Sequence, residues 1–398
     1  MSKAILSRTV WILSIISLFN DLASEMLYPV MPVYLQSVGF SVFIIGLLEG
    51  FAEAAAGLSK GYFGYLSDRT SKRLIFIRTG YALSALSKPL FALWANVWWI
   101  FLLRTSDRLG KGLRTAARDA LLSSESTPAS KGQVFGFHRS MDTAGAFLGP
   151  LLALLFLYFF PGNYTLLFLL AFFPGVAVIL LTFLLRESPH EDRQQKQTPK
   201  QAYPSSVFAF FGYWSKAPAP YRHLLSGLVL FLLFNSSDFF LLMKVKEAGF
   251  SDTYVVGSYI FYNLVYALAA YPLGMLADKA GLKTVFLTGL ALFAITYSGF
   301  AFADTIHAFV LLLLLYGLFA AATEGIIKAW ISNLVPSDET ATALGTFAAF
   351  QSICALIASS LTGLLWMCFG AATAFLTTSS AAVVSLLYLA MKMQNPPK

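Results

Sequence analysis

Long apolar segments dominate this 398-residue chain and constrain its fold more than any other feature. A transmembrane helix needs roughly 20 mainly apolar residues. Segments of this kind lie near residues 9–36, 42–66, 75–95, 97–122, 132–158 and 164–185, and a second set lies near 221–243, 253–277, 283–303, 306–334, 340–366 and 369–391. Charged residues make up 12% of the chain, whereas a soluble domain carries about 25%. The sequence therefore predicts an all-α integral membrane protein with twelve transmembrane helices.

The first apolar segment is interpreted as a retained span. It follows the basic residues Lys3 and Arg8, is too long for the core of a signal peptide, and has no cleavage site of small residues. Cys354 and Cys368 both lie in apolar segments, so no disulfide framework is indicated.

The basic residues are placed unevenly between the connecting segments. They gather around the turn between the second and third spans and in the long middle connection, at Lys60, Arg69, Lys72, Arg73, Arg78, Arg186, Arg193, Lys196, Lys200, Lys216 and Arg222. The turns near Gly39, Ala95 and Gly162 carry almost no charge. Cytoplasmic loops of membrane proteins are rich in Lys and Arg, so we expect both termini and the middle connection to be cytoplasmic. The net charge of +8 is explained by this orientation and indicates no nucleic-acid partner.

The middle connection divides the chain into three predicted parts. These are an N-terminal six-helix bundle over 1–186, a cytoplasmic linker over 187–219 and a C-terminal six-helix bundle over 220–398. The first part of the linker is polar with spaced prolines, which is typical of flexible connections. Its second part places aromatic residues beside Lys216, which favours a short helix at the membrane interface.

The two bundles are related by an internal repeat. LFNDLASEML in the first span matches LFNSSDFFLL in the seventh, and Gly39-Phe40-Ser41 matches Gly249-Phe250-Ser251. The stretch GYLSD, which begins at Gly64, matches GMLAD, which begins at Gly274. A parallel repeat of six-span halves predicts a substrate site between the halves, near the middle of the membrane.

Three stretches carry a resemblance to the major facilitator superfamily over essentially the whole chain. GYLSDRTSKR, at residues 64–73, resembles the family's loop between spans two and three, with Ser71 where glycine is usual, and GMLADKAGLK, at 274–283, keeps that glycine as Gly281. FLLRTSDRLGKGLRTAARDALL resembles the fourth-span pattern, with Arg104 at the family's arginine; Asp107 and Arg108 depart from that pattern. GAFLGP, from Gly145 to Pro150, is similar to an element associated with exporters.

This resemblance implies a monomeric secondary transporter in the inner membrane that works by alternating access, is driven by an ion gradient (usually protons), and has no enzymatic activity, cofactor or bound metal. The family's gating elements would correspond here to Gly64, Asp68, Arg69, Gly274, Asp278, Gly145, Gly149 and Pro150. Asp68, Arg69 and Asp278 are interpreted as contacts between helices and not as substrate ligands. The two small residues of span five allow helices to approach closely, and Pro150 frees a backbone carbonyl.

Charged residues within the spans are the candidate residues for substrate binding or proton coupling. A charge in the bilayer costs about 2.5–3.5 kcal/mol, so it should face protein or a water-filled cavity. The candidates are Asp21, Glu25, Glu49, Glu53, Arg104, Arg108, Lys111, Arg114, Arg118, His138, Arg139, Asp142, Asp238, Glu324 and Lys328. At helical spacing the basic residues of span four form one stripe. We expect Arg104 and Arg108 to line a cavity.

A structural interpretation of the same charges stays open. Asp107 has the spacing to pair with Arg104 or Lys111, and Asp119 has the spacing to screen Arg118. Two partners are possible for Glu324. The repeat offset relates it to Arg114, and Lys328 lies one helical turn away on the same span.

The charges also bear on the class of solute. Arginines suit a carboxylate or another anion, whereas a cationic drug would use the acids of spans one and two together with aromatic faces. Both sets are present, so the sequence favours a small amphipathic solute with an anionic or zwitterionic group, moved by proton-coupled export. Uptake of a small organic anion and a lipid flippase on the same fold are the alternatives. The four histidines are scattered without metal-ligand spacing, and no motif of a membrane enzyme occurs.

Overall fold

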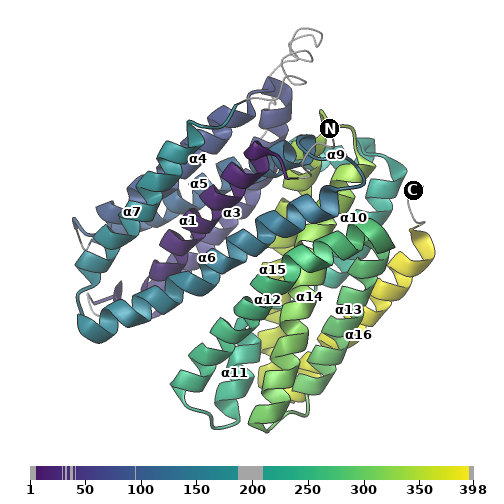
Figure 1. Cartoon of the computed structure of the whole chain (residues 1–398). Helices are drawn as coiled ribbons and strands as arrows, with labels where there is room; N and C mark the ends of the chain where they lie inside the picture. Colours follow the sequence, from purple (N-terminus) through teal and green to yellow (C-terminus); the bar gives the residue numbers. More distant parts are fainter. Residues whose placement is uncertain are drawn as a thin grey trace. The chain divides into compact units, whose positions relative to one another are not determined.

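The computed structural model (Figure 1) describes residues 6–28, 30–31, 34–35, 39–40, 42–94, 96–186 and 209–393. Within these ranges the regular structure is helical and no strand occurs. The long helices are α1 (Arg8–Leu27), α3 (Val42–Thr70), α4 (Arg73–Leu90), α5 (Val97–Ser124), α6 (Lys131–Phe159), α7 (Tyr164–Thr182), α10 (Ala219–Leu232), α12 (Asp252–Ala280), α13 (Leu282–Phe300), α14 (Ile306–Leu334), α15 (Thr340–Phe369) and α16 (Ala371–Lys392). Shorter elements are η1 (Ala209–Gly212), α9 (Tyr213–Lys216) and α11 (Phe239–Glu247).

Most of these helices coincide with the apolar segments of the sequence. In the described part of the chain, eight helices are long and apolar enough to cross a membrane: α1, α6, α7, α12, α13, α14, α15 and α16. Helices α3, α4 and α5 follow their predicted segments but carry several charged residues. The all-helical membrane architecture is therefore confirmed, whereas the number of twelve crossings stays a prediction.

The seventh span is not the continuous helix that the sequence predicts over 221–243. It is divided into α10 and α11 by the segment Leu233–Asp238. This segment contains Asn235-Ser236-Ser237-Asp238. Side chains of Asn, Ser and Asp compete for backbone hydrogen bonds in non-helical conformations, so four of them in succession weaken a helix. Because apolar residues lie on both sides of these four, the sequence was interpreted as one continuous span.

Polar side chains cap the N-terminal ends of several helices. The Oγ of Ser7 accepts a hydrogen bond from the N–H of Val10 at the start of α1 (3.3 Å). The Oδ1 of Asn96 accepts one from the N–H of Trp98 at the start of α5 (3.0 Å). Such caps satisfy backbone donors that have no partner inside the helix.

The chain forms two compact units. The first comprises Met1–Thr127, Met141–Lys216 and Val335–Ala349, and the second comprises Pro128–Ser140, Ala217–Leu334 and Phe350–Lys398. The first ten residues of α6 thus belong to the second unit, and the first ten of α15 belong to the first. The predicted domain division at 186 and 220 concerns the sequence halves and stays a prediction.

Each unit has a buried interior and an apolar exterior. In the second unit α13 packs against α14 and α16 (Figure 1). The rings of Phe293 and Tyr297 on α13 are stacked, with centroids 4.1 Å apart. In the first unit Trp98 and Tyr158, at helix ends, are 78% and 79% exposed. Exposed aromatic residues at helix ends are typical of the membrane–water interface.

The end of the linker forms a short helical element, as the sequence predicts for that part. Helix α9 follows the 3₁₀ turn η1 directly. Tyr213 is buried, and its hydroxyl donates a hydrogen bond to Glu339 Oε2 (2.9 Å), so the element is attached within the first unit. The polar part of the linker, 187–208, lies outside the described residues.

Candidate substrate and gating sites

The basic stripe of α5 is largely buried in the first unit. Arg104, Arg114 and Arg118 are 6%, 4% and 7% exposed. Arg108 is half-buried and Lys111 is exposed. Buried arginines keep their charge, so their partners decide what the stripe can do.

Asp107 neutralises two basic groups at once. Its carboxylate lies 3.7 Å from Lys88 Nζ and 3.8 Å from a guanidinium nitrogen of Arg104. The pair with Arg104 agrees with one of the two predicted pairings. Lys88, on α4, is buried and also donates a hydrogen bond to the carbonyl of Ser84 (3.0 Å). This group therefore carries one negative and two positive charges.

Arg114 is held by neutral groups. Its guanidinium donates hydrogen bonds to Ser84 Oγ (2.7 Å) and to the carbonyl of Gly80 (3.5 Å), and it lies 4.6 Å from the ring centroid of Tyr81. Gly80 makes this possible, because a Cβ there would lie 2.8 Å from the Cβ of Arg114. Among the described residues, its recorded direct contacts include no carboxylate. Asp107 and Asp21 act on this guanidinium electrostatically, without a recorded direct contact.

Arg118 links three helices through polar contacts. It forms an ion pair with Asp119 (2.9 Å), as the sequence predicts, and donates a hydrogen bond to Ser17 Oγ on α1 (3.3 Å). Ser17 in turn donates a hydrogen bond to Asp142 on α6. A buried pair with hydrogen-bonded surroundings serves structure well, and this arrangement favours the structural interpretation of Arg118.

The acids of the first two spans occupy different environments. Glu53, on α3, pairs with Arg108 of α5 (3.1 Å) although its side chain is 55% exposed. Asp21 is half-buried and accepts a hydrogen bond from Asn20 (2.9 Å), and Glu25 is half-buried one turn further along α1. Glu49 lies in α3, and its side chain is outside the described part.

The small residues of α6 lie against the acidic face of α1. A Cβ on Gly145 would lie 3.1 Å from the Cβ of Asp21, and a Cβ on Gly149 would lie 2.9 Å from that of Glu25. Both would also meet backbone atoms of α1. The glycines therefore allow the backbones of the two helices to approach closely. Gly149 directly precedes Pro150, which is buried.

The first gating motif contacts the start of α15. The carboxylate of Asp68 accepts hydrogen bonds from the N–H of Ala341 (3.2 Å) and from the N–H and hydroxyl of Thr342 (2.6 and 2.7 Å). A Cβ on Gly64 would collide with the carbonyl of Ala341. Arg69 lies over the ring of Tyr65 (4.8 Å). Asp68 therefore connects α3 to the start of α15, and its role in gating stays a prediction.

The second motif makes the corresponding contact in the second unit. Asp278 accepts hydrogen bonds from the N–H groups of Gly132 and Gln133 at the start of α6, both at 2.7 Å. A Cβ on Gly274 would collide with the carbonyl of Gly132. Each repeat therefore uses one glycine to bring a helix close and one aspartate to hold the N–H groups of its first turn.

Apart from Asp238, which precedes α11, the remaining candidates lie on α6 and α14 in the second unit. Arg139 donates a hydrogen bond to the hydroxyl of Tyr266 and lies 3.9 Å from Glu324. Glu324 therefore pairs with Arg139, a partner that the sequence does not predict, because a helix distant in sequence brings this guanidinium alongside it. The pairings of Glu324 with Arg114 and with Lys328 stay predictions. His138 is buried, and Lys328 is half-buried. The described residues contain no group of three His, Cys, Asp or Glu side chains that could hold a metal ion.

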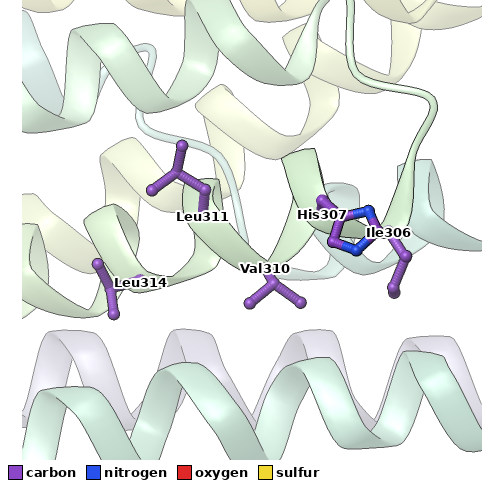
Figure 2. A pocket seen from close by; sticks show the side chains of 5 residues that line it. All are labelled: Ile306, His307, Val310, Leu311 and Leu314. Carbon is purple, nitrogen blue, oxygen red and sulfur yellow. The ribbon is translucent and has the colours of Figure 1, made fainter.

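A pocket of about 360 Å³ follows one face of α14 (Figure 2) and contains no member of these charged groups. It is lined by Ile306, His307, Val310, Leu311 and Leu314, all from one helix. A depression formed by the apolar side chains of a single membrane helix is expected on a surface that faces lipid. We do not assign a solute site to it.

The family profile described as Major Facilitator Superfamily matches residues 13–262 and 257–398, which together cover nearly the whole chain. The chain belongs to the major facilitator superfamily. This superfamily consists of transporters of small molecules, so membership identifies the protein as a multi-pass membrane transporter.

Two relatives and one solved structure are similar to the chain over most of its length. An uncharacterized MFS-type transporter, MJ1317 of Methanocaldococcus jannaschii, is 33% identical over 96% of this chain and 94% of its own length. The multi-drug resistance efflux pump PmrA of Streptococcus pneumoniae is 24% identical over 78% of this chain and 77% of its own. The human organic anion transporter MFSD10 has the same fold, with a TM-score of 0.78 at 16% identity over 96% and 99% of the two chains.

Several residues of these sites were not among the sequence candidates. Lys88 was detectable, because it is a lysine inside a predicted apolar span. Tyr81 and Ser84, which hold Arg114, and Thr342, which binds Asp68, carry no charge and fit an ordinary helix. Nothing in the local sequence distinguishes them from neighbours that only pack.

Proposed function

We propose that this protein is a secondary active transporter that moves a small amphipathic solute with an anionic or zwitterionic group across the inner membrane. Transport proceeds by alternating access of a monomer, with both termini in the cytoplasm. The direction is export, coupled to protons.

The observation that carries this proposal is the environment of Arg114. A buried guanidinium with neutral contacts leaves a positive charge available inside the membrane protein, next to a group in which Lys88 and Arg104 share one carboxylate. Guanidinium groups bind carboxylates and phosphates through two parallel hydrogen bonds. An anionic solute would supply a negative group in direct contact with this guanidinium.

Export is supported by the element from Gly145 to Pro150 and by the relatives. The element resembles one associated with exporters, and its glycines lie against the acidic face of α1. PmrA, a multi-drug resistance efflux pump, is similar over most of both chains. MFSD10, an organic anion transporter, shares only the fold, so it supports no more than the capacity of this architecture for anions.

The two aspartate contacts support a gating role in alternating access. Asp68 accepts a hydrogen bond from Thr342, and Asp278 accepts one from Gly132. Each aspartate thus holds the first turn of a helix from the other sequence half. Contacts of this kind would break in one state of the cycle and form in the other. An anionic side chain at a helix N-terminus is favourable, so each contact would stabilise the state in which it exists.

The proposal is tested by a thermal-shift screen of the purified full-length protein against anionic, zwitterionic and cationic metabolites and drugs. A ligand that binds the folded state raises its apparent stability. We expect anions or zwitterions to raise the melting temperature of the wild type and to lose this effect in Arg114→Gln. Arg222→Gln, at an exposed position of α10, is the matched control. Stabilisation by cations alone, or an unchanged response of Arg114→Gln, would contradict the assignment of an anionic solute.

A further inference from the structure

The break in the seventh span places a carboxylate inside the membrane part of the second unit. Asp238 is the residue immediately before α11, and α10 ends six residues earlier at Leu232. Helices α10 and α14 are in contact, as are α11 and α12 (Figure 1). Discontinuous membrane helices are tolerated where the irregular segment is buried in protein or lines a water-filled cavity.

Two tyrosine hydroxyls hold the carboxylate of Asp238. Tyr262 of α12 donates a hydrogen bond to Oδ2 (2.6 Å), and Tyr316 of α14 donates one to Oδ1 (2.5 Å). Both tyrosines are buried, at 4% and 5% exposure, and their ring centroids lie 5.3 Å apart. Each carboxylate oxygen therefore accepts one hydrogen bond from a buried tyrosine.

Among the described residues, the ionisable groups recorded as interacting with Asp238 are tyrosines. Tyr297 of α13 lies close enough to Asp238 to interact with it electrostatically, in addition to the two hydrogen-bonded tyrosines. On α11 itself, Lys244 pairs with Glu247 (3.6 Å). Helix α15 has no Asp, Glu, Lys, Arg or His, and α16 has only Lys392 at its last position. Among the described residues, no positive partner of Asp238 is recorded.

The group lies well inside the length of two membrane helices. Tyr262 is the tenth residue after Asp252, where α12 begins, and Tyr316 is the tenth after Ile306, where α14 begins. At about 1.5 Å per residue, each lies about 15 Å along its helix. The hydrocarbon core is about 30 Å thick, so an ionised carboxylate here is expensive without a counter-charge.

The broken segment offers further oxygen ligands. The Oδ1 atom of Asn235 is buried and has no hydrogen-bond partner in the structure. The C-terminal end of α10 carries partial negative charge on its last carbonyl groups. Such half-helix ends, together with unwound carbonyls, are suited to binding Na⁺ or a proton.

We propose that Asp238, at the break between α10 and α11, is the binding site of the coupling cation, a proton or Na⁺. This inference rests on the proposed secondary transport and names the group that would link it to an ion gradient. Binding of one positive charge neutralises the carboxylate and removes the cost of holding it at this depth. Tyr262 and Tyr316 position the carboxylate and stabilise it while no cation is bound.

The test measures the thermal stability of the purified full-length protein without any solute. One series varies pH at fixed ionic strength, and the other replaces choline chloride by NaCl at fixed pH. The wild type should be stabilised by one of the two cations, which identifies the coupling ion. Asp238→Asn should lose the larger part of that cation-dependent shift, and the matched control Asp304→Asn, at an exposed carboxylate, should keep it.

Two tyrosine variants keep the inference testable if Asp238→Asn fails to fold. Tyr262→Phe and Tyr316→Phe each remove one hydrogen bond to the ionised carboxylate, so the cation should bind more tightly. We expect the cation concentration of the half-maximal effect to fall about tenfold in each. A wild type that responds to neither cation, an Asp238→Asn variant that responds like the wild type, or tyrosine variants with unchanged midpoints would each overturn the inference. Because no solute is present, these outcomes are independent of the Arg114 test.

Discussion

Asp68 holds the first turn of α15 by accepting hydrogen bonds from both the backbone N–H and the hydroxyl of Thr342, at 2.6 and 2.7 Å. The two residues are 274 positions apart. The same relationship recurs one repeat later, where Asp278 holds the first turn of α6. A duplicated sequence motif therefore makes a duplicated contact.

Asp68→Asn should reduce transport, because the amide keeps one acceptor but loses the charge that faces a helix N-terminus and Arg73 (3.7 Å). Loss of a charge-assisted cap costs roughly 1–3 kcal/mol, so we expect a decrease in rate of about tenfold or more. Solute flux in proteoliposomes measures it. Asp338→Asn, an exposed carboxylate near the start of α15, is the control. Equal fluxes of the two variants would remove Asp68 from the gate.

Asp107→Asn should destabilise the protein more than Lys88→Met does. Asp107 lies close to both Lys88 and Arg104, so its loss removes the carboxylate that these two buried cations share, whereas loss of Lys88 leaves the pair with Arg104 intact. Removing one partner of a buried ion pair costs about 3–5 kcal/mol. Thermal unfolding of the purified variants gives the order. If Asp107→Asn is more stable than Lys88→Met, Asp107 does not stabilise Lys88 and Arg104 in the way that their distances indicate.

Gly149→Ala should lower stability and transport, because the new Cβ would lie 2.8 Å from the backbone nitrogen of Met26 on α1. Separating two packed helices to relieve such a clash costs about 1–3 kcal/mol. Gly363→Ala on α15 is a matched control, since its Cβ would meet nothing closer than 3.8 Å. Melting temperatures and flux measure both variants. Similar behaviour of the two would mean that α1 and α6 do not need this close approach.

Ser71→Gly should stabilise the protein. Ser71 has a positive φ of 51°, and Gly281, at the corresponding repeat position, has a φ of 96°. A side chain in the left-handed region costs about 1–2 kcal/mol, which glycine avoids. We expect a higher melting temperature for Ser71→Gly and a lower one for Gly281→Ala. If Ser71→Gly melts at or below the wild-type temperature, the turn is not strained by its side chain.

Single cysteines placed in the segment 187–205 should react with a membrane-impermeant reagent only after cells are opened. The positive charges of that segment predict a cytoplasmic location. Cys354 and Cys368 are replaced first, because Cys368 is exposed. Labelling of intact cells would overturn the predicted topology of both termini as well, since an even number of spans fixes them together.

The sequence by itself determined the membrane architecture and the repeat. Apolar segments of about 20 residues admit few structures other than helices in a bilayer, because backbone hydrogen bonds must be satisfied inside each segment. The duplicated glycine and aspartate of GYLSD and GMLAD were recognisable in the sequence. Close approach of a helix requires glycine, and binding of its first N–H groups requires an acceptor such as aspartate, so both repeats keep the same residue types. Pairs at short helical spacing, such as Arg118 with Asp119, were also predictable.

Only the tertiary structure decided which charges meet. Glu324 pairs with Arg139, a partner that the sequence did not predict. Asp238 is held by Tyr262 and Tyr316, which give no signal in an apolar span. The partners of a buried charge come from helices distant in sequence, and their choice depends on how helices rotate and approach. The sequence could list the charges that need partners, because burial of an ion is costly wherever it occurs. It could not assign those partners, because several combinations satisfy that cost equally until the helices are packed.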